Sequence, residues 1–320
     1  MNDEPKGKGR GLLILMARHR WLQSFFCVFF LLWTGVTGIG CSVKRTVKVK
    51  VPPRILHAKS ATFEEVLAII NNYSKINKLS CGSLKITLIS GKKESGELQK
   101  YASAPGYILL QRPNHTRLVV QYPITKTTIL DLVSAGDDFC VWVPRENKYY
   151  TGKNSAGELV AEDLPNAPGF TLRATHIFEA ILPQIDLDDD SNLLFEYSEQ
   201  VDSEAKYYIF SVFKKGFGNR LQAVKKFWIE RSQLTIARQQ VYGEDGQLVS
   251  DIFYSNNTPV NGFDLPLRIH IDRPIDGYRL EIEFASWRIN PDFPENAFTL
   301  PPPTGAQIVP LKEKGRRSFS

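Results

Sequence analysis

The chain has 320 residues, of which 42% are hydrophobic, 11% aromatic and 23% charged, so it can build a sizeable core and is not an intrinsically disordered protein. Its formal net charge is +6, but the first 40 residues hold five basic and two acidic side chains, and the remainder is close to neutral with 35 basic and 32 acidic. A near-neutral body disfavours a nucleic-acid partner, because proteins hold nucleic acid with a broad basic surface.

The start of the chain has the pattern of an exported protein. Basic Arg18 and Arg20 precede an apolar run from Leu22 to Trp33, and small residues then lead to Cys41. This order predicts a secretory signal peptide over residues 1–40, since the apolar run is too short for a comfortable membrane span.

Small residues that end at a cysteine, as in Gly38-Ile39-Gly40-Cys41, resemble the lipobox of bacterial lipoproteins. The resemblance implies that Cys41 carries a diacylglycerol and begins the mature chain. Ser42 after that cysteine implies the outer membrane, with the body facing the periplasm. An ordinary cleaved signal is the alternative, because the family prefers leucine where Gly38 stands, and translation could start at Met1 or at Met16.

Residues 41–61 are expected to form a basic tether. They hold six basic side chains between Lys44 and Lys59 and no acidic one, and Pro52-Pro53 interrupts any helix. Beside an acyl anchor such a segment is attracted to anionic headgroups. The alternative is a solvated linker.

Cys81 and Cys140 are the only cysteines left in the body once Cys27 leaves with the signal and Cys41 is modified. In an oxidising periplasm the two could form a disulfide if the fold brings them together, and two separate thiols are the alternative.

The body, residues 62–310, begins with a helix and continues as strands. Apolar residues recur at three- and four-residue spacing from Thr62 to Lys78, and Thr62 with Glu65 has the form of a capping box, which predicts an amphipathic helix. Strand-length segments between turn signals then predict strands at Leu84–Ser90, Gly106–Gln111, Thr116–Tyr122, Thr127–Val133, Asp138–Val143 and Lys148–Gly152.

The middle of the body, from Asn154 to Ser191, has weaker strand signals. It contains a predicted short helix at Thr175–Leu182 and an acidic run, Asp186–Asp190, which we interpret as a solvated loop because the ordered spacing of a calcium loop is missing. After this middle segment, strands resume at Leu193–Ser198, Lys206–Phe213, Ala223–Ile229, Gln233–Tyr242, Leu248–Tyr254, Leu265–Ile271 and Arg279–Trp287. Residues 311–320, at the end of the chain, are predicted to be a disordered tail.

Neighbouring strands joined by such short turns are antiparallel, and so large a sheet must close or fold over to protect its edges. The sequence thus predicts a mainly β protein of the α+β class.

Signatures of catalysis, of metal binding and of cofactor binding are missing. The five histidines stand in unrelated contexts, and no nucleophile elbow, phosphate-binding loop or dinucleotide fingerprint occurs. We therefore expect no enzyme activity, no cofactor and no metal, although two carboxylates facing each other across a cleft would leave no signature in the sequence.

The order of the segments resembles the LolA/LolB family of lipoprotein carriers and receptors. The resemblance is clearest over residues 62–152, where the helix and a strand are followed by Gly106-Tyr107-Ile108-Leu109-Leu110-Gln111-Arg112-Pro113, Arg117-Leu118-Val119-Val120-Gln121-Tyr122-Pro123 and Leu132-Val133-Ser134-Ala135-Gly136-Asp137-Asp138-Phe139. Phe298–Val309 resembles the C-terminal close of the family. The resemblance implies a curved antiparallel half-barrel with an amphipathic helical lid. The body is longer than compact family members, so its second half is expected to close the barrel differently.

The resemblance implies a role for two positions. Arg112 matches an arginine that ties barrel to lid through backbone carbonyls in the soluble carrier, and an exposed strand-end arginine is the alternative. Pro123-Ile124 stands at the turn where the membrane-bound receptor has an apolar residue that enters lipid, and an incidental apolar turn residue is the alternative.

A hollow half-barrel would be lined by the apolar faces of these strands and of the lid helix. Alternation sets Leu118, Val120 and Tyr122 on one face, and neighbouring strands add either Ile129 and Val133 or Leu130 and Leu132, depending on register. The alternative is a solid core. The lining expected here is Val66, Leu67, Ile70, Tyr73, Ile108, Leu110, Leu118, Val120, Tyr122, Ile129 and Val133.

The resemblance implies a membrane-anchored protein that binds acyl chains of lipoproteins or phospholipid and helps localise them to the outer membrane, with a periplasmic carrier protein as a partner. One rival is an envelope-stress sensor or other hydrophobic-ligand binding module of the same fold. A second rival is a periplasmic hydrolase.

Overall fold

The computed structural model describes residues 52–91, 98–156, 159–160, 173–185, 192–216, 218 and 220–313. The predicted signal peptide, Cys41, most of the tether and the acidic run therefore lie outside the described residues. Residues 51–320 form one compact unit, whose described part follows.

The helical elements are short. They are α2 (Pro53–Leu56), α3 (Phe63–Asn71), the 3₁₀ turn η1 (Asn72–Lys75), the 3₁₀ turn η3 (Pro144–Glu146) and α4 (Ala174–Ile181). The predicted tether thus contains one helical turn, because Pro53 occupies a first-turn position where proline is tolerated.

α3 begins at the predicted capping box. The Thr62 hydroxyl accepts a hydrogen bond from the Glu65 backbone N–H at 3.3 Å, and the Glu65 carboxylate accepts one from the Thr62 N–H at 2.7 Å. The helix is shorter than predicted, because residues after Asn71 tighten into η1 and the chain is extended from Ile76.

Every predicted strand is present. Most ends lie within three residues of the prediction, while β1 starts and β13 ends six residues beyond it. The strands are β1 (Lys78–Ser90), β2 (Gln99–Lys100), β3 (Ala104–Gln111), β4 (His115–Gln121), β5 (Thr128–Ala135), β6 (Asp138–Val143), β7 (Lys148–Lys153), β8 (Leu159–Val160), β9 (Leu193–Val201), β10 (Lys206–Lys215), β11 (Leu221–Glu230), β12 (Thr235–Tyr242), β13 (Leu248–Val260), β14 (Phe263–Arg273), β15 (Tyr278–Phe284), β16 (Arg288–Ile289), β17 (Gln307–Pro310) and β18 (Lys312–Glu313).

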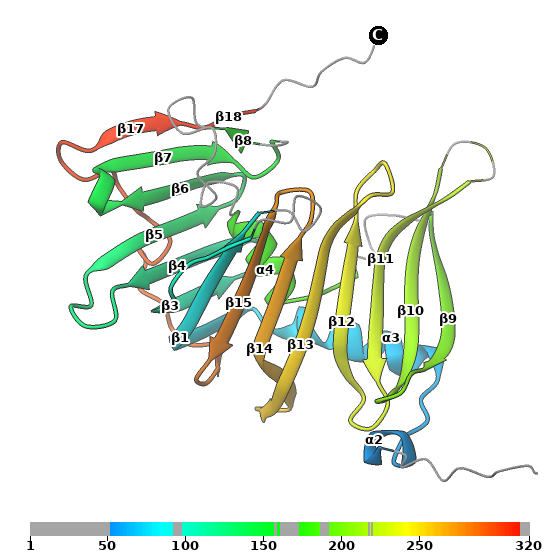
Figure 1. The fold of residues 1–320 in the computed structure, drawn as a ribbon. Helices are drawn as coiled ribbons and strands as arrows, with labels where there is room; N and C mark the ends of the chain where they lie inside the picture. Colours follow the sequence, from blue (N-terminus) through cyan, green and yellow to red (C-terminus); the bar gives the residue numbers. More distant parts are fainter. Residues whose placement is uncertain are drawn as a thin grey trace, which may run out of the picture. The chain divides into compact units, whose positions relative to one another are not determined.

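One large sheet has the order β17-β7-β6-β5-β4-β3-β1-β15-β14-β13-β12-β11-β10-β9, with β2 and β16 also paired to β1 (Figure 1). The first long strand thus lies in the middle and joins two meanders, β3–β7 and β9–β15. Pairing is antiparallel throughout the described strands except for β17, which runs parallel to β7. The purely antiparallel sheet that we predicted is therefore a mixed one.

The sheet is curved. β3 and β11 are six positions apart in the strand order, about 29 Å along a flat sheet, yet Arg112 at the end of β3 and Lys225 on β11 both donate hydrogen bonds to Gln184. α3 packs against β10 and β12, and α4 packs against β4, β5 and β14, on the same side of the sheet (Figure 1). We call this side the concave face, and one apolar core cluster lies between it and the helices.

The opposite, outer face carries the end of the chain. Residues 290–306, which we call the C-terminal strap, follow β16 and lead to β17 at the sheet edge. The strap is fixed by Arg117, which donates to the Ala297 carbonyl at 3.1 Å, and by the Tyr149 hydroxyl, which donates to the Leu300 carbonyl. Beyond it, β18 pairs with β8, so that the tail predicted to be disordered from residue 311 starts with a short strand.

Candidate functional site

Most of the residues that we expected to line a cavity lie between the helices and the sheet, where they are packed against other side chains. The eight residues that fall there belong to the core cluster or pack against it, and five of them are 0% exposed: Val66, Ile70, Ile108, Leu110 and Leu118. The other three are Leu67, Tyr73 and Val120. In this structure the protein's own side chains fill the space around these residues, as in the alternative of a solid core.

Three predicted lining residues lie elsewhere. Leu118 and Val120 pair with Leu132 and Leu130, so Val133 is on the outer face, and Ile129 is the extra residue of a bulge between two pairs of β4 and β5. Tyr122 is 37% exposed. The placement of Tyr122, Ile129 and Val133 in the cavity was wrong. The bulge shifts the register of Ile129 and Val133 from the one that simple alternation suggests, and Tyr122 lies beyond the end of β4.

Arg112 joins the end of β3 to both helical segments. Its guanidinium donates to the carbonyl oxygens of Tyr73 and Ile76, each at 3.0 Å, and to the side-chain oxygen of Gln184, two residues beyond Leu182. The guanidinium carbon lies 5.8 Å from the ring centre of Phe178 in α4. The side chain therefore contacts backbone carbonyls of the helical layer, which is the kind of contact that the resemblance implies.

A buried polar cluster holds the other end of α4. Arg173 donates to the carbonyl oxygens of Asn154 and Ala156. Arg273 donates to His176 Nε2 at 2.9 Å, and since arginine has no acceptor, His176 carries its proton on Nδ1 and donates to the Tyr278 hydroxyl at 3.0 Å. The cluster escaped the sequence reading because its members are distant along the chain.

Burial holds the pKa of His176 well below its ordinary value, and the nearby cations of Arg273 and Arg173 lower that pKa further. The imidazole is therefore neutral at neutral pH. An ion pair of 2.7 Å with Asp276 holds Arg273 in place beside it.

Side chains, rather than a backbone ladder, attach α4 to the sheet. Besides the contacts at its two ends, the Tyr254 hydroxyl donates to the Ala180 carbonyl at 2.8 Å, and Lys225 donates to the Gln184 carbonyl at 3.0 Å. α4 directs Ile177, Phe178 and Ile181 into the core. A movement of α4 would thus expose apolar surface without breaking a strand pairing.

The Pro123-Ile124 turn projects between β4 and β5. Ile124 is 93% exposed, more than the other large apolar side chains of the described residues. Its position permits contact with another surface, as the resemblance implies.

The cysteines of the body are separate thiols. Cys81 is buried on β1 and Cys140 is half-buried on β6, four strand positions away, about 19 Å along the sheet. That separation is far outside the range for a disulfide, so their pairing is corrected to the alternative of two free thiols.

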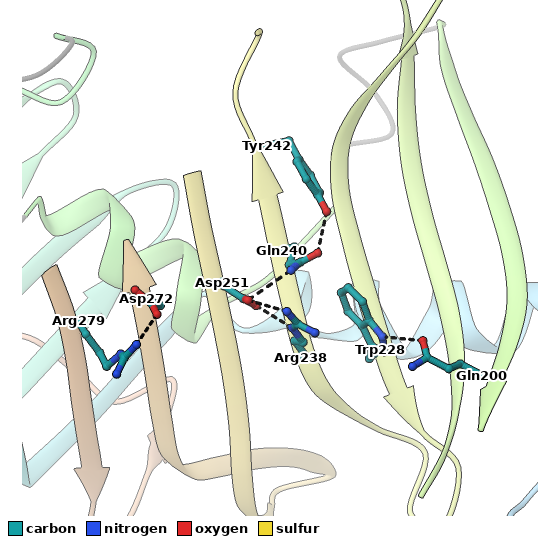
Figure 2. A network of polar contacts seen from close by, with 8 residues as sticks. All are labelled: Gln200, Trp228, Arg238, Gln240, Tyr242, Asp251, Asp272 and Arg279. Atoms are coloured by element: carbon teal, nitrogen blue, oxygen red, sulfur yellow. Dashed lines mark hydrogen bonds and ion pairs between the residues drawn. The ribbon is translucent and has the colours of Figure 1, made fainter. Parts of the chain in front are cut away.

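The outer face of β9–β15 carries a row of paired polar groups (Figure 2). Arg238 donates to both carboxylate oxygens of Asp251, at 2.7 and 2.6 Å, and its guanidinium lies over the rings of Trp228 and Phe253. On the neighbouring strands β15 and β14, Arg279 forms an ion pair with Asp272, with 2.6 Å between the guanidinium nitrogen and the carboxylate oxygen. In each of these two ion pairs the opposite charges neutralise each other on this part of the outer face.

Two further findings concern membranes and metals. Among the described residues no helix is long and apolar enough to cross a membrane. Within the same ranges, no three His, Cys, Asp or Glu side chains come together as metal ligands would.

No protein-family model and no curated protein matches the chain. Among solved structures it is similar to a DUF1329 family protein from Desulfovibrio piger, at 14% identity over 73% of this chain and 94% of that one, with a TM-score of 0.48. A LolA superfamily protein from Nitrosomonas europaea matches at 13% identity over 75% and 99%, with a TM-score of 0.45. A Vibrio parahaemolyticus domain named for outer-membrane lipoprotein sorting matches at 11% identity over 74% and 94%, with a TM-score of 0.41. The structures similar to this chain thus include the LolA superfamily, which its sequence resembles.

Proposed function

We propose that this protein is an outer-membrane lipoprotein, anchored through Cys41 and facing the periplasm, that binds acyl chains of lipoproteins or phospholipid on its concave face and helps place them in the membrane. A periplasmic carrier would deliver the cargo. The proposal requires no chemical step, only apolar burial and release.

The observation that carries the proposal is the attachment of α4. This helix covers an apolar concave face, and each hydrogen bond described above that joins α4 or its flanking residues to the rest of the protein involves a side chain. Ile177, Phe178 and Ile181 of α4 lie in the core on this face, in the space that an acyl chain would take under the proposal. An acyl chain that displaces α4 gains about 0.8 kcal/mol for each buried CH₂. A chain of ordinary length therefore offsets the free energy that is lost when the three side chains of α4 leave the core.

In-cell photo-crosslinking tests the proposal on the full chain. A photoreactive phenylalanine analogue at Phe178, on the core-facing side of α4, is compared with the same analogue at Phe253, which is 42% exposed on the outer face. We expect acylated proteins or phospholipid to be captured from position 178 and not from position 253. Capture of one stable, non-acylated protein would favour the sensor, and capture of no lipid-bearing species would contradict the proposal.

A further inference from the structure

A second apolar site lies on the outer face, under the C-terminal strap. A cavity of about 640 Å³ opens between the sheet and the strap, within the size range of pockets that take small ligands. Its floor is formed by outer-face side chains of β5, β6 and β7, and its wall by the strap and the residue after β17. The residues that line the cavity include Val133, Cys140, Tyr149, Phe298, Leu300 and Leu311.

Two polar groups of the floor already have partners. The Tyr149 hydroxyl and the Cys140 thiol both donate to the Leu300 carbonyl, the thiol at 3.9 Å. Burial raises the pKa of the Cys140 thiol, so the floor carries no thiolate at neutral pH. A ligand in this cavity is therefore recognised by apolar contact, as an alkyl chain would be.

The rim is charged and its balance is negative. Lys153 and Asp138 line the cavity and pair at 2.7 Å, and Asp137 lies 4.0 Å from the same ammonium. Asp137 does not itself line the cavity, but together with Asp138 and Lys153 it makes a group of two carboxylates and one ammonium at the rim, with a net charge of −1. This charge disfavours a carboxylate headgroup and suits a zwitterionic one with an exposed cation.

We propose that this cavity binds the alkyl chain of a single-chain lipid with a zwitterionic headgroup, on the face opposite to the concave site. The chain lies over Val133 and Cys140 beneath the strap, and the cationic end of the headgroup meets Asp138 at the rim. The site does not depend on movement of α4, so it stands apart from the function proposed above.

Protection of the Cys140 thiol from maleimide by added lipid tests the proposal. The full chain is used, in membranes of the cells that produce it. The rate of maleimide labelling at Cys140 is followed by mass spectrometry of its peptide, which separates it from the buried Cys81. Lysophosphatidylcholine with a 16-carbon chain, below its micelle concentration, is expected to slow labelling at least fivefold, and hexadecanoate is expected to slow it less than twofold. No protection by the lysolipid, or equal protection by both, would overturn the proposal.

A filling variant and a matched control locate the effect. Ala135 lines the cavity and is exposed, so Ala135→Trp fills the mouth without disturbing the core, while Ala102→Trp places the same ring at an exposed site outside the cavity. Protection by the lysolipid should disappear in the first variant and persist in the second. Persistence in both would place the lipid elsewhere.

A charge reversal tests the headgroup. Asp138→Lys changes the rim from −1 to +1, and hexadecanoate should then protect Cys140 more strongly than the lysolipid does. An unchanged order of the two lipids would overturn the role of the rim. Photo-crosslinking at Phe178 reports on the concave site alone, so failure of either proposal can be recognised separately.

Discussion

Arg112 attaches the helical layer to the end of β3 through three hydrogen bonds. It satisfies the Tyr73 and Ile76 carbonyls and reaches Gln184 with one rigid, planar group, which a lysine ammonium cannot reproduce. We expect Arg112→Lys to lower the free energy of the local opening of α4 by about 2 kcal/mol, the usual value of one charged hydrogen bond. Hydrogen exchange should speed up in the amides of α4 and remain unchanged in β13. Equal acceleration in both elements would mean global destabilisation instead.

His176 makes the stability of the protein depend on pH. Its pKa is lowered in the folded state, so the unfolded chain, with an ordinary pKa of about 6.5, takes up the proton first as the pH falls. The contribution of His176 to stability is therefore fully present above about pH 6.5 and is lost below it, by up to about 1.4 kcal/mol per pH unit.

Urea unfolding at several pH values measures this dependence. In His176→Gln the free energy of unfolding should decrease less steeply below pH 6.5. In His57→Gln, a change at an exposed site, the decrease should be the same as in the unchanged protein. A slope that survives in His176→Gln would contradict the role assigned to this residue.

At the residue scale, the sequence supported the Arg112 contact only through the family resemblance. It could not predict the cluster of His176, Arg273 and Tyr278, because no local spacing pairs residues about a hundred positions apart. It also could not predict that Val133 lies on the outer face, because one bulge residue, Ile129, reverses the alternation that precedes it.

At the scale of elements, strands were predicted well because most are long, alternating and bounded by turns, and α3 was predicted at its start because its capping box is local. β17 and β18 were missed since they are too short for a periodic signal. The strap has no secondary structure of its own, and contacts with the sheet position it.

The Arg117–Asp131 pair should determine how firmly the strap is held. The two side chains pair at 2.8 Å with 21% and 11% of their areas exposed, and Arg117 also donates to the Ala297 carbonyl. Arg117→Ala leaves Asp131 as an uncompensated, mostly buried charge, and we expect a loss of about 2–4 kcal/mol in the free energy of unfolding. Proteolysis within residues 290–306 should accelerate as well. The same substitution at Arg268, whose pair with Glu283 is about half exposed, should cost under about 1 kcal/mol.

At the scale of the whole molecule, membrane contact is expected at the Ile124 turn. Burying this side chain in lipid contributes about 1.5–3 kcal/mol, so Ile124→Asp should weaken binding of the chain without its acyl anchor to phosphatidylethanolamine–phosphatidylglycerol vesicles at least tenfold. Ile308 on β17 is 58% exposed and provides the control, since Ile308→Asp changes an equally apolar surface residue elsewhere. Equal losses in both variants would remove any special role of the turn.

The fold class and the apolar concave side followed from strand patterns and their order, but whether that side is hollow did not. Alternation shows which side chains face inward, and only packing shows that α3 and α4 fill the space. The proposed function therefore requires α4 to leave its place when an acyl chain enters.

A distance measurement between α4 and the sheet tests this movement most directly. Spin labels at the exposed Glu179 on α4 and Ser255 on β13, in a Cys140→Ser background, report their separation while a diacylated lipopeptide is added. We expect a second population with a longer distance, which grows with the lipopeptide and is larger in Arg112→Lys. A single unchanged distance at saturating lipopeptide would contradict the account.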